Sequence, residues 1–256
     1  MTKIVNGVKD FSQYDTRWAD KPYRNLPACM RFNGCGPSST ADIIASRYDV
    51  TPNDTRIWLI QHNYVVNGAG TIHDGIPAVL RYYGFSVNQY SKMSDVFSEM
   101  KKGNRCAVFL MNKNIAPNGS RWTKGGHFIA IKGYKYKTES GKHYFYVCDP
   151  GQRMLDGWAC YETQMKGCIS KTWIAFLPKP TLPTLPKRVY FIQGDKGKEV
   201  KKLQQCLNYI GYDCGYADGI LGDKTILAIR KFKVKHKIGK LDKFGEKSLK
   251  ALKKAL

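Results

Sequence analysis

Residues 33–48 read NGCGPSSTADIIASRY, and they place a cysteine between two glycines just before the start of a helix. Pro37 suits the first turn of a helix, where its missing N–H would have no partner, and the alanine and isoleucines that follow supply an apolar face. At this position Cys35 would meet the positive end of the helix dipole and unpaired N–H groups, which favour a thiolate. Its glycine neighbours are expected to let a substrate backbone come close. On its own, such a cysteine is more often a small buried residue in a turn.

Helices are expected in the first hundred residues and strands in the next eighty. Thr51 can cap a helix that has Pro52 in its first turn and Asp54 near the positive end of its dipole. Ser94 can cap a further helix that ends at Gly103. The expected helices cover 36–48, a stretch from Pro52 on, 74–83 and 94–103, and the expected strands cover 105–112, 127–134, 143–149 and 172–178. Leading helices followed by an antiparallel sheet predict an α+β domain.

His127 and Asp149 are candidate partners for the cysteine. His127 begins an expected strand after two glycines, and Asp149 ends the next strand. A hairpin turn near Thr138 would put both residues at the same open end of one hairpin. A carboxylate beside an imidazole fixes its tautomer, and the imidazole can take a thiol proton and return it to a leaving amine. Singly they have plainer interpretations, a core histidine and a turn-forming aspartate, but with Cys35 they predict a catalytic triad.

Four motifs follow in order: FSQYDTRW (11–18), GCGPSS (34–39), GGHFIAIKGY (125–134) and VCDPG (147–151). Together they resemble the papain-like bacteriocin-leader peptidase family and its soluble relatives, over most of residues 9–178. The resemblance implies a papain-like cysteine peptidase domain with Cys35 as nucleophile, His127 as general base and acid, and Asp149 as the residue that orients the imidazole. It also implies that Gln13 supplies the side-chain amide of the oxyanion hole. The family's exporters add a membrane span and an ATPase, which this sequence lacks, so leader-peptide processing is not expected.

The composition indicates a folded protein with an anionic partner. Hydrophobic residues make up 43% of the chain, and 42 Lys+Arg against 20 Asp+Glu give a formal net charge of +22. The hydrophobic fraction excludes wholesale disorder. The net charge is compatible with binding to nucleic acid, to an acidic membrane face or to a bacterial wall. Apolar runs such as AVFLM at 107–111 are too short to span a bilayer, so no membrane span is expected. The first ten residues lack the apolar region of a signal peptide.

The positive charge is denser towards the end of the chain. The 70 residues after Pro186 hold 18 Lys+Arg against seven Asp+Glu, which is half of the net charge. Before them lies PKPTLPTLPKR (178–188), whose four prolines indicate a semi-rigid extended spacer. We therefore expect a peptidase domain over 1–178, a proline-rich linker over 179–188 and a second domain over 189–256.

The cysteines give little reason to expect metal. The chain has eight and no CxxC pair, so no metal site and no cofactor are predicted. Most are expected to be reduced, buried, small apolar residues. A disulfide between Cys206 and Cys214, formed after export, is the alternative.

The second domain carries an internal repeat. GDKTILAI (222–229) matches GEKSLKAL (245–252) at an offset of 23 residues. Each unit joins a glycine turn, a Thr or Ser near a helix start, and an apolar stripe. A preceding helix has an apolar stripe from Val200 to Ile210 and ends at Gly211. Two units and that helix predict a compact, all-α, three-helix module.

The same segment carries a longer pattern: Val200, Leu203-Gln204, Leu207, Gly211-Tyr212, Asp218-Gly219, Gly222, Thr225, Ala228 and Phe232. This pattern resembles the small three-helix peptidoglycan-binding domain attached to many wall hydrolases. Most of these residues form the core or turns. The candidates for contact with peptidoglycan are Tyr212, Asp218, Gly219, Lys224 and Thr225. For each of them the plainer interpretation is that it caps or packs, and the lysines of 231–240 are more often a solvated face.

Three functions are compatible with these features. The first is a peptidoglycan hydrolase that cuts an amide of the wall stem peptide or cross-bridge, while the second domain concentrates it on the polymer and charge attracts it to anionic wall polymers. The second is an N-acetylmuramoyl-L-alanine amidase with the same triad. The third is a non-catalytic basic protein that binds wall or nucleic acid. The sequence shows no known nucleic-acid-binding motif, so no specific nucleic-acid partner is predicted.

The cellular route expected for the hydrolase is that of a phage endolysin. Such a protein builds up in the host bacterial cytoplasm, where reducing conditions would keep Cys35 active. It would then reach the cell wall through a holin pore.

Overall fold

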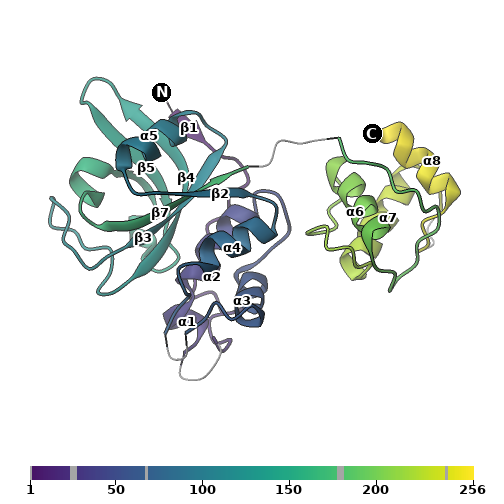
Figure 1. Ribbon diagram of the computed structural model, residues 1–256, viewed down its shortest axis with the longest axis horizontal. Coiled ribbons are helices and arrows are strands. Elements are labelled where there is room, and N and C mark those ends of the chain that lie inside the picture. The colour runs from purple at the N-terminus through teal and green to yellow at the C-terminus, as the bar shows by residue number, and fades with distance from the viewer. Residues whose placement is uncertain (1, 24–27, 67–68, 178–181, 240–241) are drawn as a thin grey trace. The chain divides into compact units, whose positions relative to one another are not determined.

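An antiparallel seven-stranded sheet forms the centre of one unit, Met1–Pro178, and a second unit covers Lys179–Leu256 (Figure 1). This computed structural model describes residues 2–23, 28–66, 69–177, 182–239 and 242–256. The strand order is β2-β7-β3-β4-β5-β6, and β1 pairs with β4. The strands are β1 Thr2–Ile4, β2 Ser86–Tyr90, β3 Arg105–Met111, β4 His127–Lys137, β5 Lys142–Cys148, β6 Gly157–Cys160 and β7 Ile169–Phe176.

Helices pack on both faces of this sheet. α1 to α4 gather below it in Figure 1, where the ring of His73, next to α4, meets Phe128 of β4 edge-on. α5 packs on the other face, where Val96 shares a core with Ile129 and Ile131, because neighbouring residues of a strand point to opposite faces. The helices are α1 Met30–Asn33, α2 Cys35–Ile44, α3 Pro52–Gln61, α4 Gly75–Tyr82, α5 Met93–Lys101, the 3₁₀-helix η1 Arg153–Leu155 and the π-helix η2 Tyr161–Met165.

The α+β architecture predicted from the sequence is confirmed, with one wrong cap. Thr51 and Asp54 form the capping box of α3, with the backbone N–H of Thr51 donating to the Asp54 carboxylate at 2.8 Å. The helix expected to begin at Ser94 begins at Met93 instead, so Lys92 is its N-cap. The backbone is already helical before Ser94, whose hydroxyl contacts Asp95 instead. The short strands β1, β2 and β6 were not predicted.

The second unit is the three-helix module that the repeat predicts. α6 covers Lys198–Tyr209, α7 covers Asp223–Lys235 and α8 covers Glu246–Ala255. Gly222 and Gly245 are the N-caps of α7 and α8, and the matching residues Thr225 and Ser248 are each 2% exposed. The two sequence repeats are therefore also structural repeats, because each places a hydroxyl side chain in the interior at the same point of its helix.

The proline-rich stretch is not a free spacer over its described part. Pro178 to Thr181 lie outside the described residues. Leu185 packs against the core of the second unit, and the carboxylate of Glu199 accepts the backbone N–H groups of Lys187 and Arg188. The expected linker therefore contributes its later residues to the second unit, because its leucine side chain is apolar and its non-proline residues keep their N–H groups.

The cysteines are all free thiols. Seven are buried and Cys35 alone is half-buried. Cys206 and Cys214 donate to different carbonyl oxygens, those of Thr184 and Tyr212, so the alternative disulfide is not formed. Across the described ranges, no group of three or more His, Cys, Asp or Glu residues could hold a metal ion. The described part of the chain also contains no helix that is long and apolar enough to cross a membrane.

Candidate active site

Cys35 is itself the first residue of α2, whereas the sequence predicted it just before the helix. The adjacent glycines have a structural purpose. A Cβ on Gly36 would lie 2.1 Å from the hydroxyl of Thr71, and one on Gly34 would lie 2.3 Å from the carbonyl oxygen of Met30. Both distances are far inside van der Waals contact. The packing of the protein's own atoms therefore requires glycine at both positions, and the approach of a substrate backbone to them stays a prediction.

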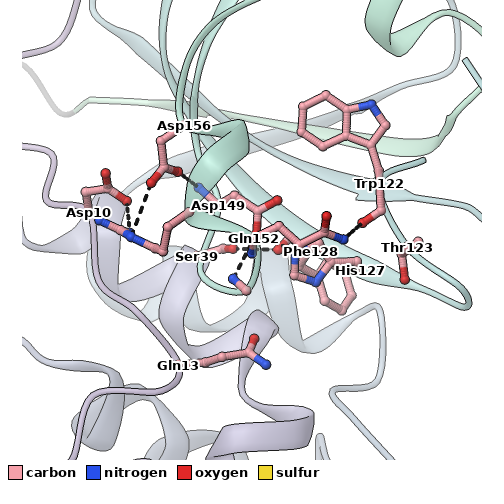
Figure 2. Close-up of polar contacts among 12 residues, drawn as sticks. Asp10, Gln13, Ser39, Trp122, Thr123, His127, Phe128, Asp149, Gln152 and Asp156 are labelled. Atoms are coloured by element: carbon pink, nitrogen blue, oxygen red, sulfur yellow. Dashed lines mark hydrogen bonds and ion pairs between the residues drawn. The ribbon is translucent and has the colours of Figure 1, made fainter. Parts of the chain in front are cut away.

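The β4–β5 hairpin brings His127 and Asp149 together. Lys137 pairs with Lys142, so the turn covers 138–141, and a bulge between Ile131 and Gly133 shifts the register nearer the open end. His127 Nε2 lies 2.7 Å from Asp149 Oδ1 (Figure 2). The two residues therefore lie at the same open end of the hairpin, as the sequence predicts.

The backbone N–H groups that follow Asp149 hold its carboxylate in place. Its Oδ1 accepts the N–H groups of Gly151 and Gln152, both at 2.8 Å, as well as the bond to His127. Burial raises the pKa of Asp149, but these hydrogen bonds, that of His127 foremost, lower it below its ordinary value. A Cβ on Gly151 would lie 3.1 Å from His127 Cε1, so glycine allows the turn to close over the ring.

Cys35 and His127 form a coupled pair. Burial raises the pKa of the Cys35 thiol, but a hydrogen bond with His127 and the N–H groups of Phe128 and Gly36 outweigh it, so the pKa is lowered. Burial lowers the pKa of His127, yet its bonds with Asp149 and Cys35 raise it to about 10. Because Nε2 faces Asp149, Nδ1 is the ring nitrogen left for the thiol. The arrangement favours a thiolate beside an imidazolium, which is a nucleophile beside a proton donor.

Gln13 lies between the Asp149 turn and the segment before Cys35. Its backbone N–H donates to Pro150 at 2.9 Å, and its side-chain amide donates to the carbonyl oxygen of Arg31 at 2.7 Å. The residue is 5% exposed, and its Oε1 is buried without a hydrogen-bond partner. A primary amide has two N–H donors, so the bond to Arg31 leaves one for another acceptor.

A charged network behind Asp149 was not anticipated from the sequence. The carboxylate of Asp156 accepts the backbone N–H of Asp149 at 2.6 Å, and Arg153 forms ion pairs with Asp156 and with Asp10 (Figure 2). Burial raises the pKa of Asp156 to about 6. One arginine and one further aspartate lie within seven residues of Asp149 along the chain, and this local clustering of charge was the available signal.

The predicted peptidoglycan contacts lie in the second unit around Gln204, a buried residue of the sequence pattern that was not predicted as a contact. Gln204 is 1% exposed and donates its amide N–H groups to Asp218 at 2.9 Å and to the Thr225 hydroxyl at 3.0 Å. Its Oε1 accepts the N–H of Gly219 at 2.8 Å. Three of the five candidates are therefore held by internal hydrogen bonds.

The other two candidates differ from each other. Tyr212 is half-buried and meets Phe232 edge-on, with ring centroids 5.3 Å apart. Lys224 is exposed in the first turn of α7. Tyr212 therefore has a packing role, whereas Lys224 lies on the surface of the module.

Comparison with known proteins covers both units. Residues 5–176 match the family described as "Peptidase_C39 like family", and residues 196–239 match the "Putative peptidoglycan binding domain". These matches agree with the sheet of the first unit and with α6 and α7 of the second.

Similar solved structures include the N-terminal domain of SleB, which is 30% identical over 28% of this chain and 97% of its own, with a TM-score of 0.26. A "putative C39-like peptidase" from Bacillus anthracis is 15% identical over 70% of this chain and 98% of its own, with a TM-score of 0.45. The bromelain protease from Ananas comosus, in complex with the E64 inhibitor, is 12% identical over 69% and 99%, with a TM-score of 0.39.

Proposed function

The chain belongs to the Peptidase_C39 like family of cysteine peptidases, and from this membership we propose that it is a peptidoglycan hydrolase. In this proposal Cys35, His127 and Asp149 cleave an amide bond of the wall stem peptide or cross-bridge. The carrying observation is that one chain joins a C39-like cysteine peptidase domain to a peptidoglycan-binding domain. The second domain would hold the first on an insoluble substrate and so raise its effective concentration.

The proposed reaction begins with the thiolate of Cys35. Its sulfur attacks the carbonyl carbon of the amide and forms a tetrahedral intermediate. The imidazolium of His127 then gives its proton to the nitrogen of the breaking C–N bond, and the amine leaves. A water molecule, deprotonated by the neutral imidazole, hydrolyses the resulting thioester and restores the thiolate and the imidazolium. Asp149, bound to Nε2 at 2.7 Å, would keep the ring oriented through both half-reactions.

Gln13 is proposed to stabilise the oxyanion of the tetrahedral intermediate. The side-chain amide of Gln13 has a second N–H that its bond to Arg31 does not use. Its backbone N–H is bonded to Pro150, the residue after Asp149. Because the amide is neutral and buried, it can donate to a developing negative charge without reorganising solvent.

The proposed cellular route is that of a phage endolysin that is released to the wall by a holin. It is supported by the eight free thiols, which suit a reducing cytoplasm. Expression in a bacterial host with and without a co-expressed holin tests the route. Lysis only in the presence of the holin supports it, and lysis without the holin contradicts it.

Mass spectrometry of fragments released from purified walls tests the function. Wild type is expected to release peptide fragments with new amino termini, whereas Cys35→Ala is expected to bind the walls and release nothing. Fragments with free lactoyl-sugar ends would instead identify an N-acetylmuramoyl-L-alanine amidase. Binding without release by the wild type would identify a non-catalytic wall protein, and release by Cys35→Ala would contradict the proposed triad.

A further inference from the structure

A layer of lysines and aromatic rings covers part of the sheet face opposite α5. We call it the Lys–aromatic surface. The residues that alternate with it, such as Ile131, Phe145 and Ala159, point to the opposite face and belong to the core under α5. The surface consists of Lys132, Lys135 and Lys137 of β4, Lys142, Tyr144 and Tyr146 of β5, and Trp158 of β6.

Cation–π contacts join these side chains into one layer. The ammonium of Lys132 lies 4.4 Å from the ring centroid of Tyr146, and that of Lys135 lies 4.3 Å from the ring of Trp158. Lys135 is also 5.1 Å from the ring of Tyr144. Tyr146 and Trp158 meet edge-on with centroids 5.3 Å apart. The rings therefore fix the lysine side chains in an array, which reduces the entropy lost when a ligand binds.

The four lysines of this array outnumber the carboxylates beside them among the residues that the structure describes. In the described ranges, none of its four lysines forms an ion pair with a carboxylate. Lys137 and Lys142 lie directly opposite each other on paired strands, and like charges in such positions are destabilising. An anion bound between them would relieve the repulsion.

A hollow of about 410 Å³ adjoins the array where β1 meets the β4–β5 turn. Lys135 and Lys137 line it, and Glu139 is its only carboxylate among the lining residues. The volume suits a small-molecule-sized group, such as one phosphate-bearing unit of a polymer. The remaining lining residues are Thr2, Tyr136 and Thr138.

We propose that the Lys–aromatic surface binds a phosphodiester-linked anionic polymer of the cell wall. That the ligand is a wall polymer rests on the proposed function. That it is a phosphodiester rests on the complementarity between its negative charges and the four lysines. Lysine ammonium groups already lie over the rings of Tyr144, Tyr146 and Trp158. Because nucleic-acid bases would need those ring faces for stacking, the arrangement favours a polymer without bases.

The surface is close to the proposed catalytic site along the chain. Tyr146 precedes Asp149 by three residues, which is about 10 Å along a strand. Lys132 and Tyr146 form the end of the surface nearest Asp149, whereas the hollow beside the β4–β5 turn lies at the other end of the hairpin. A polymer that runs along both strands would reach the end of the sheet where His127 and Asp149 meet. The first unit would thus bind the wall through its own contacts, in addition to those of the second unit.

Lysine acetylation footprinting of the full-length protein tests the location. Poly(glycerol phosphate) is the probe, and Cys35→Ala provides the background so that binding is measured without cleavage. Lys132, Lys135, Lys137 and Lys142 are expected to become protected when the polymer binds. Exposed lysines elsewhere in the first unit, such as Lys92, are expected to stay reactive. Equal protection of all lysines, or protection confined to residues 187–256, would overturn the proposal.

A pair of charge-matched variants tests the affinity. Replacing Lys132, Lys135 and Lys137 together by Gln is expected to weaken binding of poly(glycerol phosphate) about tenfold, and to flatten its salt dependence. Replacing the exposed Lys92, Lys101 and Lys113 by Gln removes the same charge and is expected to change affinity less than about twofold. Equal losses in the two variants would mean a diffuse charge effect and would overturn the proposal.

Two further readouts separate this proposal from its alternatives. If a single-stranded oligonucleotide binds the same lysines more tightly than poly(glycerol phosphate) at the same ionic strength, the ligand of this surface is a nucleic acid and the proposal of a wall polymer is wrong. Cleavage of a soluble wall peptide is expected to be unchanged in the Lys132/Lys135/Lys137 variant, because this surface does not touch Cys35 in the proposed reaction. If Cys35→Ala loses wall cleavage while the lysine variant binds the polymer as wild type does, the proposed function is supported and the proposed binding surface is contradicted.

Discussion

The Cys35 site and the Gln204 cluster are both built from polar side chains that the sequence motifs contain, yet they use their hydrogen-bonding capacity differently. At the first, one N–H of Gln13 remains available after its bond to Arg31, and the hydrogen bonds made to the half-buried Cys35 sulfur favour its reactive thiolate form. At the second, Gln204 is bonded to Asp218, Gly219 and Thr225. A motif residue whose hydrogen-bonding groups are all used inside the protein indicates a structural role. A motif residue that keeps a reactive atom or an unused donor indicates a chemical role.

The largest expected effect is at the nucleophile. Cys35→Ala removes the attacking sulfur and is expected to lower kcat/KM for a soluble wall peptide by about 10⁴-fold or more. The free energy of unfolding is expected to change little, because Cys35 is only half-buried. Urea unfolding of both proteins is the control. Retained hydrolysis would mean that the first region, like the second, is structural.

Asp149→Asn tests the hydrogen bond to His127. The amide keeps the shape but can present an N–H to Nε2, which disfavours the tautomer and the imidazolium that catalysis needs, so kcat is expected to fall by about 10²–10⁴-fold. Single-turnover kinetics measure the step. A fall in kcat/KM that comes from KM alone would place Asp149 in substrate binding instead.

Gln13→Ala tests whether its remaining N–H serves the oxyanion. The expected loss is about 10²–10³-fold in kcat, with Cys35 alkylation unaffected, because the thiolate does not depend on this amide. Gln13→Glu is the matched variant, and its carboxylate is expected to be at least as damaging. A loss of less than about threefold in both would leave Gln13 as a packing residue held by Arg31 and Pro150.

Gln204→Ala tests the second region. It would leave Asp218, Gly219 and Thr225 with unsatisfied polar groups, so we expect about 2–3 kcal/mol less stability of the second unit. Wall binding is expected to fall with it, while hydrolysis of a soluble peptide is unchanged. The exposed Gln193→Ala is the control, with an expected change below about 0.5 kcal/mol. Full stability with lost wall binding would make Gln204 a ligand contact.

Asp156→Asn is expected to have the smallest effect, on pH dependence. Burial raises the pKa of Asp156 to about 6 in the folded protein, above about 3.9 in the unfolded chain. The native state therefore binds this proton more tightly, so its contribution to stability is largest at low pH and is lost as pH rises from about 4 to about 6. Asparagine does not titrate, so this slope is expected to disappear in unfolding curves across that range. An unchanged slope would show that Asp156 is not its source.

The sequence predicted much of the fold because local signals agreed with the tertiary structure. The capping box at Thr51 and Asp54 and the repeat at 222–229 and 245–252 are examples. The strands that were missed are short and pair at the edges of the sheet or with the far half of β4, where no alternating run is long enough to signal them. The wrong cap at Ser94 arose because a helix boundary depends on the backbone one or two residues away.

The candidate site was predictable where chain order alone brings residues together. The hairpin placed His127 beside Asp149, and the helix start placed Cys35. The network of Asp10, Arg153 and Asp156 was not predictable, because Asp10 reaches it from a distant segment of the chain. The packing requirement for Gly34 and Gly36 was also missed, because their neighbours come from folded contacts that no motif encodes.

The most direct test of the thiolate–imidazolium pair is the pH dependence of Cys35 alkylation, mapped by mass spectrometry on the native protein. We predict that Cys35 reacts well below the ordinary thiol pKa of about 8.5, because His127 and two backbone N–H groups stabilise its thiolate. Burial raises the pKa of Cys206 to about 11, so that buried thiol is expected to stay unreactive under the same conditions. Alkylation of Cys35 that begins only near or above the ordinary thiol pKa would contradict a thiolate–imidazolium pair, and with it the proposed mechanism.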